Sequence, residues 1–171
     1  MTEHRRRIDR ILEPEYIARV DTRSEEELRA MHHECTELET EVSYVRRLAQ
    51  ARIDILQAEI ERRAAGGSLG DLIAALPQIL AGDDGRPAPA STHLPQHFAP
   101  RGDIEWNRGL ERLVNDSTLV NLPSLSDEEL NHTLEQLRQF ENETSTARKA
   151  LHGVLDVVDH ELAARAAVEQ R

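Results

Sequence analysis

Hydrophobic residues recur at helical spacing over two long stretches of the chain. In the first stretch, steps of three and four join Leu28, Met31, Cys35, Leu38, Val42, Val45, Ala49, Ile53, Leu56 and Ile60. In the second stretch, the same steps join Leu130, Thr133, Leu137, Phe140, Thr144, Ala147, Leu151, Leu155, Val158 and Leu162. A stripe this narrow is typical of a coiled-coil seam. A helix with one apolar stripe is not stable alone over about 60 Å, at 1.5 Å per residue, so each stretch needs a partner helix.

The ends of both stretches carry the signals of helix starts and stops. Ser24 precedes three glutamates, of which Glu27 is placed for a capping box, and Ser126 precedes Asp127-Glu128-Glu129 in the same way 102 residues later. Gly66-Gly67 ends the first pattern. The sequence therefore predicts long helices over 24–65 and 126–171, and the chain reads as an internal duplication of one long helix.

The segment before the first long helix, residues 1–23, predicts an arm with a short helix over 3–13. Ile8, Ile11 and Leu12 lie on one side of this helix, and Pro14 stops it or marks a bend. Four arginines lie mostly elsewhere around it: Arg5, Arg6, Arg7 and Arg10. We expect them to be solvated at a fraying end, in preference to contacting an anionic partner.

The segment between the long helices, residues 66–125, predicts short helices and a linker. An amphipathic helix over 69–80, kinked or divided at Pro77, has an apolar side made of Leu72, Ile73, Leu76, Ile79 and Leu80. Residues 82–102, rich in proline, predict a mobile linker. A second short helix over 104–114 contains Trp106, which is either a packing anchor, the favoured interpretation, or a contact for a partner.

Together these elements predict an all-α fold of one domain, an intramolecular coiled coil of two long helices. The connection is long enough for either polarity of pairing. We favour the antiparallel one, because opposed helix dipoles and a pseudo-two-fold axis suit a duplicated helix.

Composition narrows the classes of partner. The chain of 171 residues is 31% charged and only 3% aromatic, with a formal net charge of −11. This charge argues against direct binding of nucleic acid and suits a basic partner, such as a factor that itself binds DNA, or solubility alone. Cys35 is the single cysteine, so an internal disulfide and a multi-cysteine zinc site are excluded. No signal peptide and no membrane span is evident, and we expect a cytoplasmic protein.

One set of polar residues occurs twice in register beside the apolar seams. The first set is Glu39, Ser43, Arg46, Gln50 and Asp54, and the second is Glu141, Ser145, Arg148, His152 and Asp156. Each member of the second set lies 102 residues after its counterpart in the first. Steps of four, three, four and four hold five side chains within about 80° of one helix face, roughly 90° from the seam. Solvated or salt-bridging residues on a coiled-coil flank are the alternative, which the exact recurrence and a serine in mid-helix disfavour.

The residue types of this motif indicate a purine nucleotide. An arginine can donate to guanine O6 and N7 or stack on a base, and an aspartate can accept from the N1–H and N2 edge of guanine. Ser, Gln and His add donors for phosphate or ribose, and Glu accepts from amino or hydroxyl groups or holds the arginine. Arg47 and Lys149, next to the two motif arginines, offer further charge for phosphates. A metal site is disfavoured because Arg and Ser stand among the acids.

The pattern E-x3-S-x2-R-x3-Q-x3-D, present on two helices of one chain, resembles the RsiG-type anti-sigma factors. These bind cyclic di-GMP and then sequester the sporulation sigma factor WhiG, a relative of the flagellar sigma factors. The resemblance covers about half of the chain. It implies an antiparallel coiled coil that holds a cyclic di-GMP dimer, one motif for each molecule, with the ten motif residues as ligand contacts. His152 departs from the pattern, which has Gln there; this puts that contact and its pH dependence in question.

The resulting hypothesis is a ligand-dependent anti-sigma factor that is not an enzyme. The main alternative is an acidic coiled-coil adaptor without a ligand, and a helix-in-groove contact by the short helices can accompany either role. An enzyme or metal site would have to come from His93, His97 and Asp103, or from His32, His33 and Cys35. The first group falls in the linker and the second spreads around a helix, so neither is pre-organised.

Overall fold

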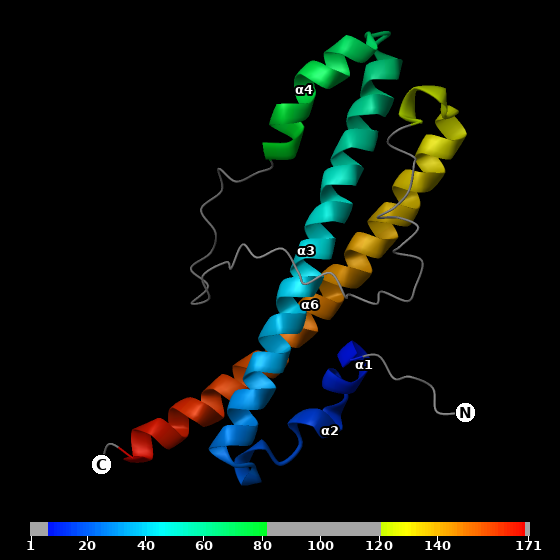
Figure 1. Cartoon of the computed structure of the whole chain (residues 1–171). Coiled ribbons are helices and arrows are strands. Elements are labelled where there is room, and N and C mark those ends of the chain that lie inside the picture. Colours follow the sequence, from blue (N-terminus) through cyan, green and yellow to red (C-terminus); the bar gives the residue numbers. More distant parts are fainter. Residues whose placement is uncertain (1–6, 82–120, 170–171) are drawn as a thin grey trace, which may run out of the picture. The chain divides into compact units, whose positions relative to one another are not determined.

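The computed structural model of the chain describes residues 7–81 and 121–169. Within them the regular structure is helical: α1 (Arg7–Ile11), α2 (Pro14–Ile17), the 3-10 helix η1 (Val20–Thr22), α3 (Glu25–Ala64), α4 (Leu69–Ala81), the 3-10 helix η2 (Leu122–Ser124) and α6 (Asp127–Glu169) (Figure 1). The all-α class with two long packed helices is thereby confirmed. The linker over 82–102 and the short helix over 104–114 with Trp106 lie outside the described residues.

The long helices begin and end as their terminal residues predict. The Ser24 hydroxyl accepts a hydrogen bond from the Glu27 amide at 3.2 Å, and the Glu27 carboxylate accepts from the Ser24 amide at 2.7 Å. Ser126 and Glu129 repeat this capping box at the start of α6. After α3, Gly66 adopts a positive φ of 67°, and the Gly67 amide donates to the Arg62 carbonyl. This is a Schellman ending, in which glycine avoids the strain of a Cβ.

The described chain forms two compact units. Of the described residues, the first unit contains 7–43 with 144–169, and the second contains 44–81 with 121–143, so α3 and α6 each contribute to both. In the first unit His32 pairs with Asp159, and the carbonyl of Arg23 accepts a hydrogen bond from Arg165. The earlier residue thus contacts the later partner, so the two helices are antiparallel. In the second unit Arg46 pairs with Glu141 and Arg63 with Asp127, which gives the same polarity.

The core of the first unit joins the N-terminal arm to the long helices. Leu28, Met31 and Val158 form a buried cluster against which Tyr16, Val20 and Leu162 pack. Contrary to the expectation of a solvated basic cluster, Arg7 and Arg10 of the arm contact α3. Arg7 donates to Glu37 at 2.9 Å and Arg10 donates to Glu34, so a row of acids on α3 binds part of the basic cluster. Ile11 is fully buried.

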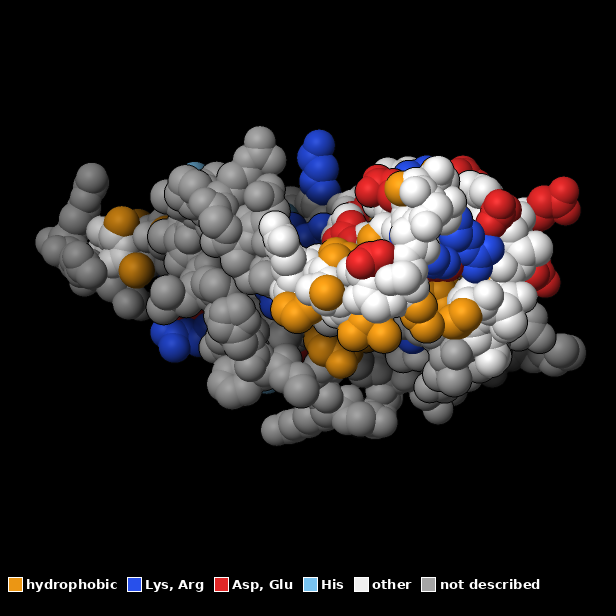
Figure 2. Space-filling model, turned by 90° about the horizontal axis from the view of Figure 1, so that it is seen from above, with side chains coloured by type: hydrophobic (Ala, Val, Ile, Leu, Met, Phe, Trp, Pro, Cys, Tyr) orange, Lys and Arg blue, Asp and Glu red, His pale blue; other side chains and the backbone are white. Residues whose placement is uncertain are grey.

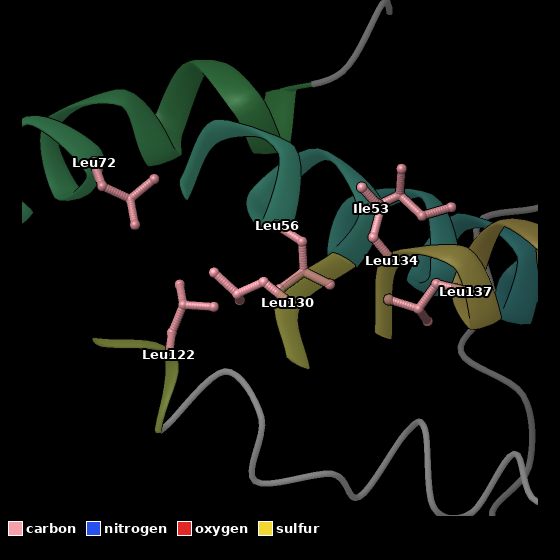
Figure 3. Close-up of a cluster of buried hydrophobic side chains, with 7 residues drawn as sticks. All are labelled: Ile53, Leu56, Leu72, Leu122, Leu130, Leu134 and Leu137. Carbon is pink, nitrogen blue, oxygen red and sulfur yellow. The ribbon is translucent and has the colours of Figure 1, made fainter. Parts of the chain in front are cut away.

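The core of the second unit is a cluster of leucines and one isoleucine contributed by four elements. Figure 3 shows Ile53 and Leu56 of α3, Leu72 of α4, Leu122 of η2 and, from α6, Leu130, Leu134 and Leu137. The structure corrects three positions here. Leu134 is buried and Thr133 is not, Glu59 occupies the buried position expected for Ile60, and Ile73 of α4 is 58% exposed.

The amphipathic helix predicted over 69–80 is one helix in the structure. Pro77 lies inside α4 and does not divide it. Leu72 is buried, whereas Leu69 and Ile73 are exposed. Figure 2 shows a band of hydrophobic side chains at the surface, beside acidic and basic ones, and a few hydrophobic side chains apart from it. In the part of the chain that the structure describes, no helix is both long and apolar enough to cross a membrane.

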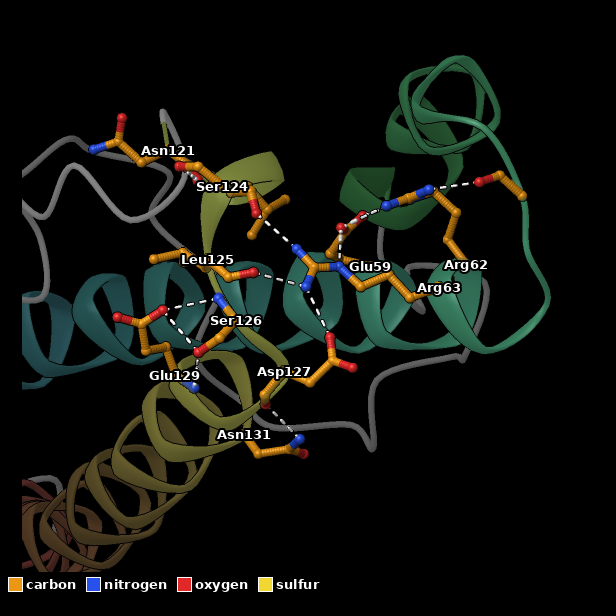
Figure 4. A network of polar contacts seen from close by, with 12 residues as sticks. Glu59, Arg62, Arg63, Asn121, Ser124, Leu125, Ser126, Asp127, Glu129 and Asn131 are labelled. Atoms are coloured by element: carbon orange, nitrogen blue, oxygen red, sulfur yellow. Dashed lines mark hydrogen bonds and ion pairs between the residues drawn. The ribbon is translucent and has the colours of Figure 1, made fainter.

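A buried carboxylate holds the arginine that joins the end of α3 to the start of α6 in the second unit. Glu59 is fully buried and accepts hydrogen bonds from Arg62 and from Arg63, each at 2.7 Å. Arg63 also donates to the carbonyls of Leu122 and Leu125 and to the Asp127 carboxylate (Figure 4). The two arginines compensate the charge of Glu59, which is why a carboxylate is tolerated at a core position.

Candidate functional site

Residues of both motif copies meet in the first unit around Glu39. The Glu39 carboxylate accepts hydrogen bonds from the Ser43 hydroxyl at 2.8 Å and from Arg148 Nε at 2.9 Å. His152 Nε2 lies 3.0 Å from the same oxygen. Arg148 Nε also donates to the Ser43 hydroxyl at 2.9 Å. We call Glu39, Ser43, Arg148 and His152 the Glu39 cluster, and it joins α3 to α6.

The environment of Glu39 keeps its carboxyl group ionised. Burial raises the pKa of Glu39, but hydrogen bonds from His152, Ser43 and Arg148 and the charge of Arg148 outweigh it, so the pKa lies below its ordinary value. An ionised carboxylate is what a nearby guanidinium requires. The cluster is therefore a set of donors organised around one anion.

The second unit contains the reciprocal pair of the motif. Arg46 donates through an NH1 group to the Glu141 carboxylate, and the two atoms lie 3.3 Å apart. Gln50 does not reach across to α6 in the way that His152 reaches to α3; its amide donates to Asp54 of its own helix at 3.2 Å. We call Arg46, Glu141, Gln50 and Asp54 the Arg46 cluster.

Arg46 is incompletely satisfied in this cluster. Its Nε is buried and has no hydrogen-bond partner among the described residues, a condition shared only by Arg23 Nε among their buried side-chain nitrogen and oxygen atoms. The counterpart Arg148 Nε has two acceptors. A buried donor without an acceptor is rare in native structures and costs about 1–3 kcal/mol. The Arg46 guanidinium is thus less fully hydrogen-bonded than that of Arg148.

The remaining predicted site residues lie at or near the surface. Ser145 is half-buried and belongs to the first unit, and Asp156 is exposed. Arg47 and Lys149, expected to support phosphates, are exposed. Their roles stay predictions.

The contacts of the motif residues differ in one respect from what the sequence of each helix alone predicts. In both units the glutamate of one motif copy contacts the arginine of the other, whereas the sequence presented each copy as a set on one helix. This cross-pairing follows from antiparallel packing, and only the spatial register of the two helices reveals it. The predicted position beside the seam is confirmed, since the motif residues named in these contacts are half-buried or exposed, next to buried Val42, Val45 and Leu151.

The groups considered for an enzyme or metal site are placed as follows. His32 pairs with Asp159, His33 pairs with Glu37, and Cys35 is buried with its thiol 3.9 Å from the Tyr16 hydroxyl. His93, His97 and Asp103 lie outside the described residues. Over residues 7–81 and 121–169, no group of three or more His, Cys, Asp or Glu side chains could hold a metal ion.

Comparison with known proteins agrees with the resemblance read from the motif. A family model described as RsiG-like matches residues 14–80 and 116–171, which is most of the chain and includes both motif copies. A search of curated proteins found no match. The extent of the family match, over both long helices and the segments that flank them, shows that the chain belongs to the RsiG-like family.

Proposed function

We propose that this chain is an anti-sigma factor controlled by cyclic di-GMP, which sequesters a sigma factor of the WhiG or flagellar type while the ligand is bound. Membership of the RsiG-like family, a family of regulatory proteins, implies an anti-sigma role of the RsiG type. To that role we add the ligand, the class of sigma factor and the ligand contacts. The observation that carries the proposal is the duplicated motif, whose arginines lie in two clusters of hydrogen-bonding side chains.

The chemistry of the clusters suits a guanine nucleotide with phosphates. Arg46 and Arg148 donate to phosphate or to guanine O6 and N7, and Asp54 and Asp156 accept from the guanine N1–H and N2 edge. Ser43, Ser145, Gln50 and His152 add donors for phosphate or ribose. A cyclic di-GMP dimer brings four phosphate charges to an acidic chain, so the local basic residues, with Arg47 and Lys149, must balance them.

Control of the sigma factor then follows from linkage. Ligand that binds more tightly to the sigma complex than to the free chain stabilises that complex by the same factor. The net charge of −11 favours a basic surface on the sigma factor. At high ligand concentration the sigma factor is held away from RNA polymerase and promoter.

Calorimetric titration of the purified chain with cyclic di-GMP tests the ligand. We expect saturable binding of about two molecules per chain, lost in the double variant R46A/R148A. R29A is the control for the removal of an arginine, because Arg29 is exposed on α3 and pairs with Glu25 of the same helix. Unchanged binding in R46A/R148A would contradict the assignment of the site.

A ligand-free coiled-coil adaptor is the second candidate, and one observation favours it. The pairs Glu39–Arg148 and Arg46–Glu141 join α3 to α6, so they can act as interhelical salt bridges alone. The charge-swap variant R46E/E141R separates the two roles because it keeps an ion pair and removes the arginine from its position. An adaptor predicts sigma binding that needs no cyclic di-GMP and survives the swap, whereas our proposal predicts that ligand binding is lost with little change in melting temperature.

A further inference from the structure

The outer side of α4 carries apolar side chains that the core of the second unit does not bury. Among the described residues four large hydrophobic side chains are exposed, and two of them, Leu69 at 41% and Ile73 at 58%, lie one helical turn apart on this helix. We call Leu69 and Ile73 the α4 strip. We propose that the α4 strip is the docking surface for a segment of this same chain, residues 104–114, which contains Trp106. This inference does not depend on the proposed function.

The α4 strip borders the buried core of the second unit. Leu72 of α4 is buried in the cluster that also contains Leu122 of η2 (Figure 3). At about 100° per residue, Leu69 and Ile73 lie on the same side of Leu72, about 60° and 100° around the helix from it. A second helix laid against the strip would therefore extend this cluster. Exposed apolar side chains that adjoin a core are typical of a surface that another element covers.

The path of the chain brings the segment back to the place that it leaves. Residues 82–120, which lie outside the described residues, follow Ala81, the last residue of α4, and precede η2. Because Leu72 of α4 and Leu122 of η2 pack in one cluster, the segment starts and finishes beside the same core. Its own side chains are therefore the nearest candidates to cover the strip.

The elements at both ends of this segment are held in place. Arg62 donates a hydrogen bond to the Gly67 carbonyl just before α4, and Arg63 donates to the carbonyls of Leu122 and Leu125. A connection tied at both ends beside the strip is present there at a high effective concentration, an advantage that a separate partner lacks.

The connection is also long enough for residues 104–114 to lie along α4. The helix has 13 residues and is about 20 Å long at 1.5 Å per residue. Residues 115–121, between the segment and Leu122, can span about 23 Å when they are extended, at about 3.3 Å per residue. The segment can therefore reach the strip from η2 without any change in the described helices.

The sequence of the segment supplies a matching apolar side. Trp106, Leu110 and Leu113 follow one another at steps of four and three, so the short helix predicted over 104–114 places them on one face. Tryptophan buries more apolar surface than most side chains, which suits it to cover Leu69 and Ile73. A surface segment of this kind can open locally without unfolding the core, so its docking adds little to the free energy of unfolding. A local probe is needed to detect it.

The fluorescence of Trp106 in the full chain is that probe, because the sequence contains no other tryptophan. In the wild type we expect emission at a shorter wavelength than in the chain unfolded by guanidinium chloride, and weaker quenching by acrylamide. The variant L69S/I73S should move both values toward those of the unfolded chain. Both replaced side chains are exposed, so the circular dichroism of the long helices should not change.

The matched control is Y44S/V168S, which replaces the two other exposed large hydrophobic side chains of the described residues and leaves α4 intact. It should not alter the fluorescence of Trp106. The variant L110S tests the segment side of the contact and should expose Trp106 as L69S/I73S does.

Three results would overturn the proposal. The first is a wild-type Trp106 as open to acrylamide as in the unfolded chain, and the second is shielding that L69S/I73S leaves unchanged. The third is shielding that weakens as the wild-type chain is diluted, which would assign the α4 strip to a second copy of the chain.

Discussion

Glu59 offers the most direct test of what holds the second unit together. Its side chain has no exposed surface, and three hydrogen bonds of 2.7 Å reach it from Arg62 and Arg63. The variant E59Q keeps the shape and removes the charge, and it turns an amide donor toward the arginine donors. Breaking a buried ion pair from one side costs about 3–5 kcal/mol. We expect about 3 kcal/mol, the lower end, because Arg62 and Arg63 keep 19% and 20% of their side-chain surface exposed and can bind water.

The assay for this prediction is thermal unfolding followed by circular dichroism. For a chain of this length about 3 kcal/mol corresponds to a decrease in melting temperature of about 6–12 °C. The matched control is E61Q, since Glu61 is exposed on the same helix and its change removes the same charge. A decrease in E59Q no larger than that in E61Q would refute the claim that Glu59 holds Arg63 in its contacts with Leu122, Leu125 and Asp127.

The same network predicts a dependence of stability on pH. The hydrogen bond from Arg62 is the main cause that lowers the pKa of Glu59; burial opposes it and Arg63 adds to it. A carboxyl group whose folded pKa is lowered stabilises the protein above its unfolded pKa, about 4.3, and this stabilisation is lost as the pH falls through the folded value. The decrease in melting temperature caused by E59Q should therefore be full at pH 7 and should shrink below about pH 4.

Two further predictions concern the core and the Glu39 cluster. L56A removes a side chain that is only 1% exposed and should lower the free energy of unfolding by about 2–5 kcal/mol. I73A, on the exposed side of α4, should change it by less than about 0.5 kcal/mol. Chemical denaturation measures both values, and equal effects would contradict the described core. R148A should raise the pKa of Glu39, because fewer hydrogen-bond donors then oppose the effect of burial. Carbon-detected NMR titration of the Glu39 carboxyl group measures this pKa. An unchanged pKa would show that Arg148 does not hold Glu39 in solution.

Much of the fold could be read from the sequence because each decisive signal is local. Ser24 and Ser126 specify their helix starts through side chains three residues away, and Gly66 specifies the end of α3 through its own backbone. The apolar stripes place most of the buried residues of α3. Antiparallel pairing was favoured from dipoles and symmetry, and contacts within each unit confirm it.

The positions that sequence reasoning missed depend on distant partners. Glu59 lies in the core because Arg62 and Arg63 compensate its charge. A search for apolar residues at helical spacing selects Ile60 instead, because it does not take such ion pairs into account. Leu134 takes the buried position that was expected for Thr133, because steps of four and three from Leu130 are as helical as steps of three and four. The hydroxyl of Thr133 instead donates a hydrogen bond to the Glu129 carbonyl of its own helix.

The sequence predicted which residues belong to the candidate site, but it did not predict which of them contact each other. The ten motif positions follow from spacing, but the pairing of Glu39 with Arg148 and of Arg46 with Glu141 depends on which turns of two helices lie opposite each other. Arg7 and Arg10 likewise bind acids of α3, and no local pattern indicates that.

The central claim is that cyclic di-GMP controls the capture of a sigma factor by this chain. The most direct measurement is the affinity of the purified chain for a WhiG-type sigma factor by biolayer interferometry, with and without saturating cyclic di-GMP, repeated with R46A/R148A. We predict binding at least about tenfold tighter with the ligand in the wild type, within the usual range of coupling between two sites, and no effect of the ligand in the double variant. The same affinity with and without cyclic di-GMP in the wild type would contradict the account.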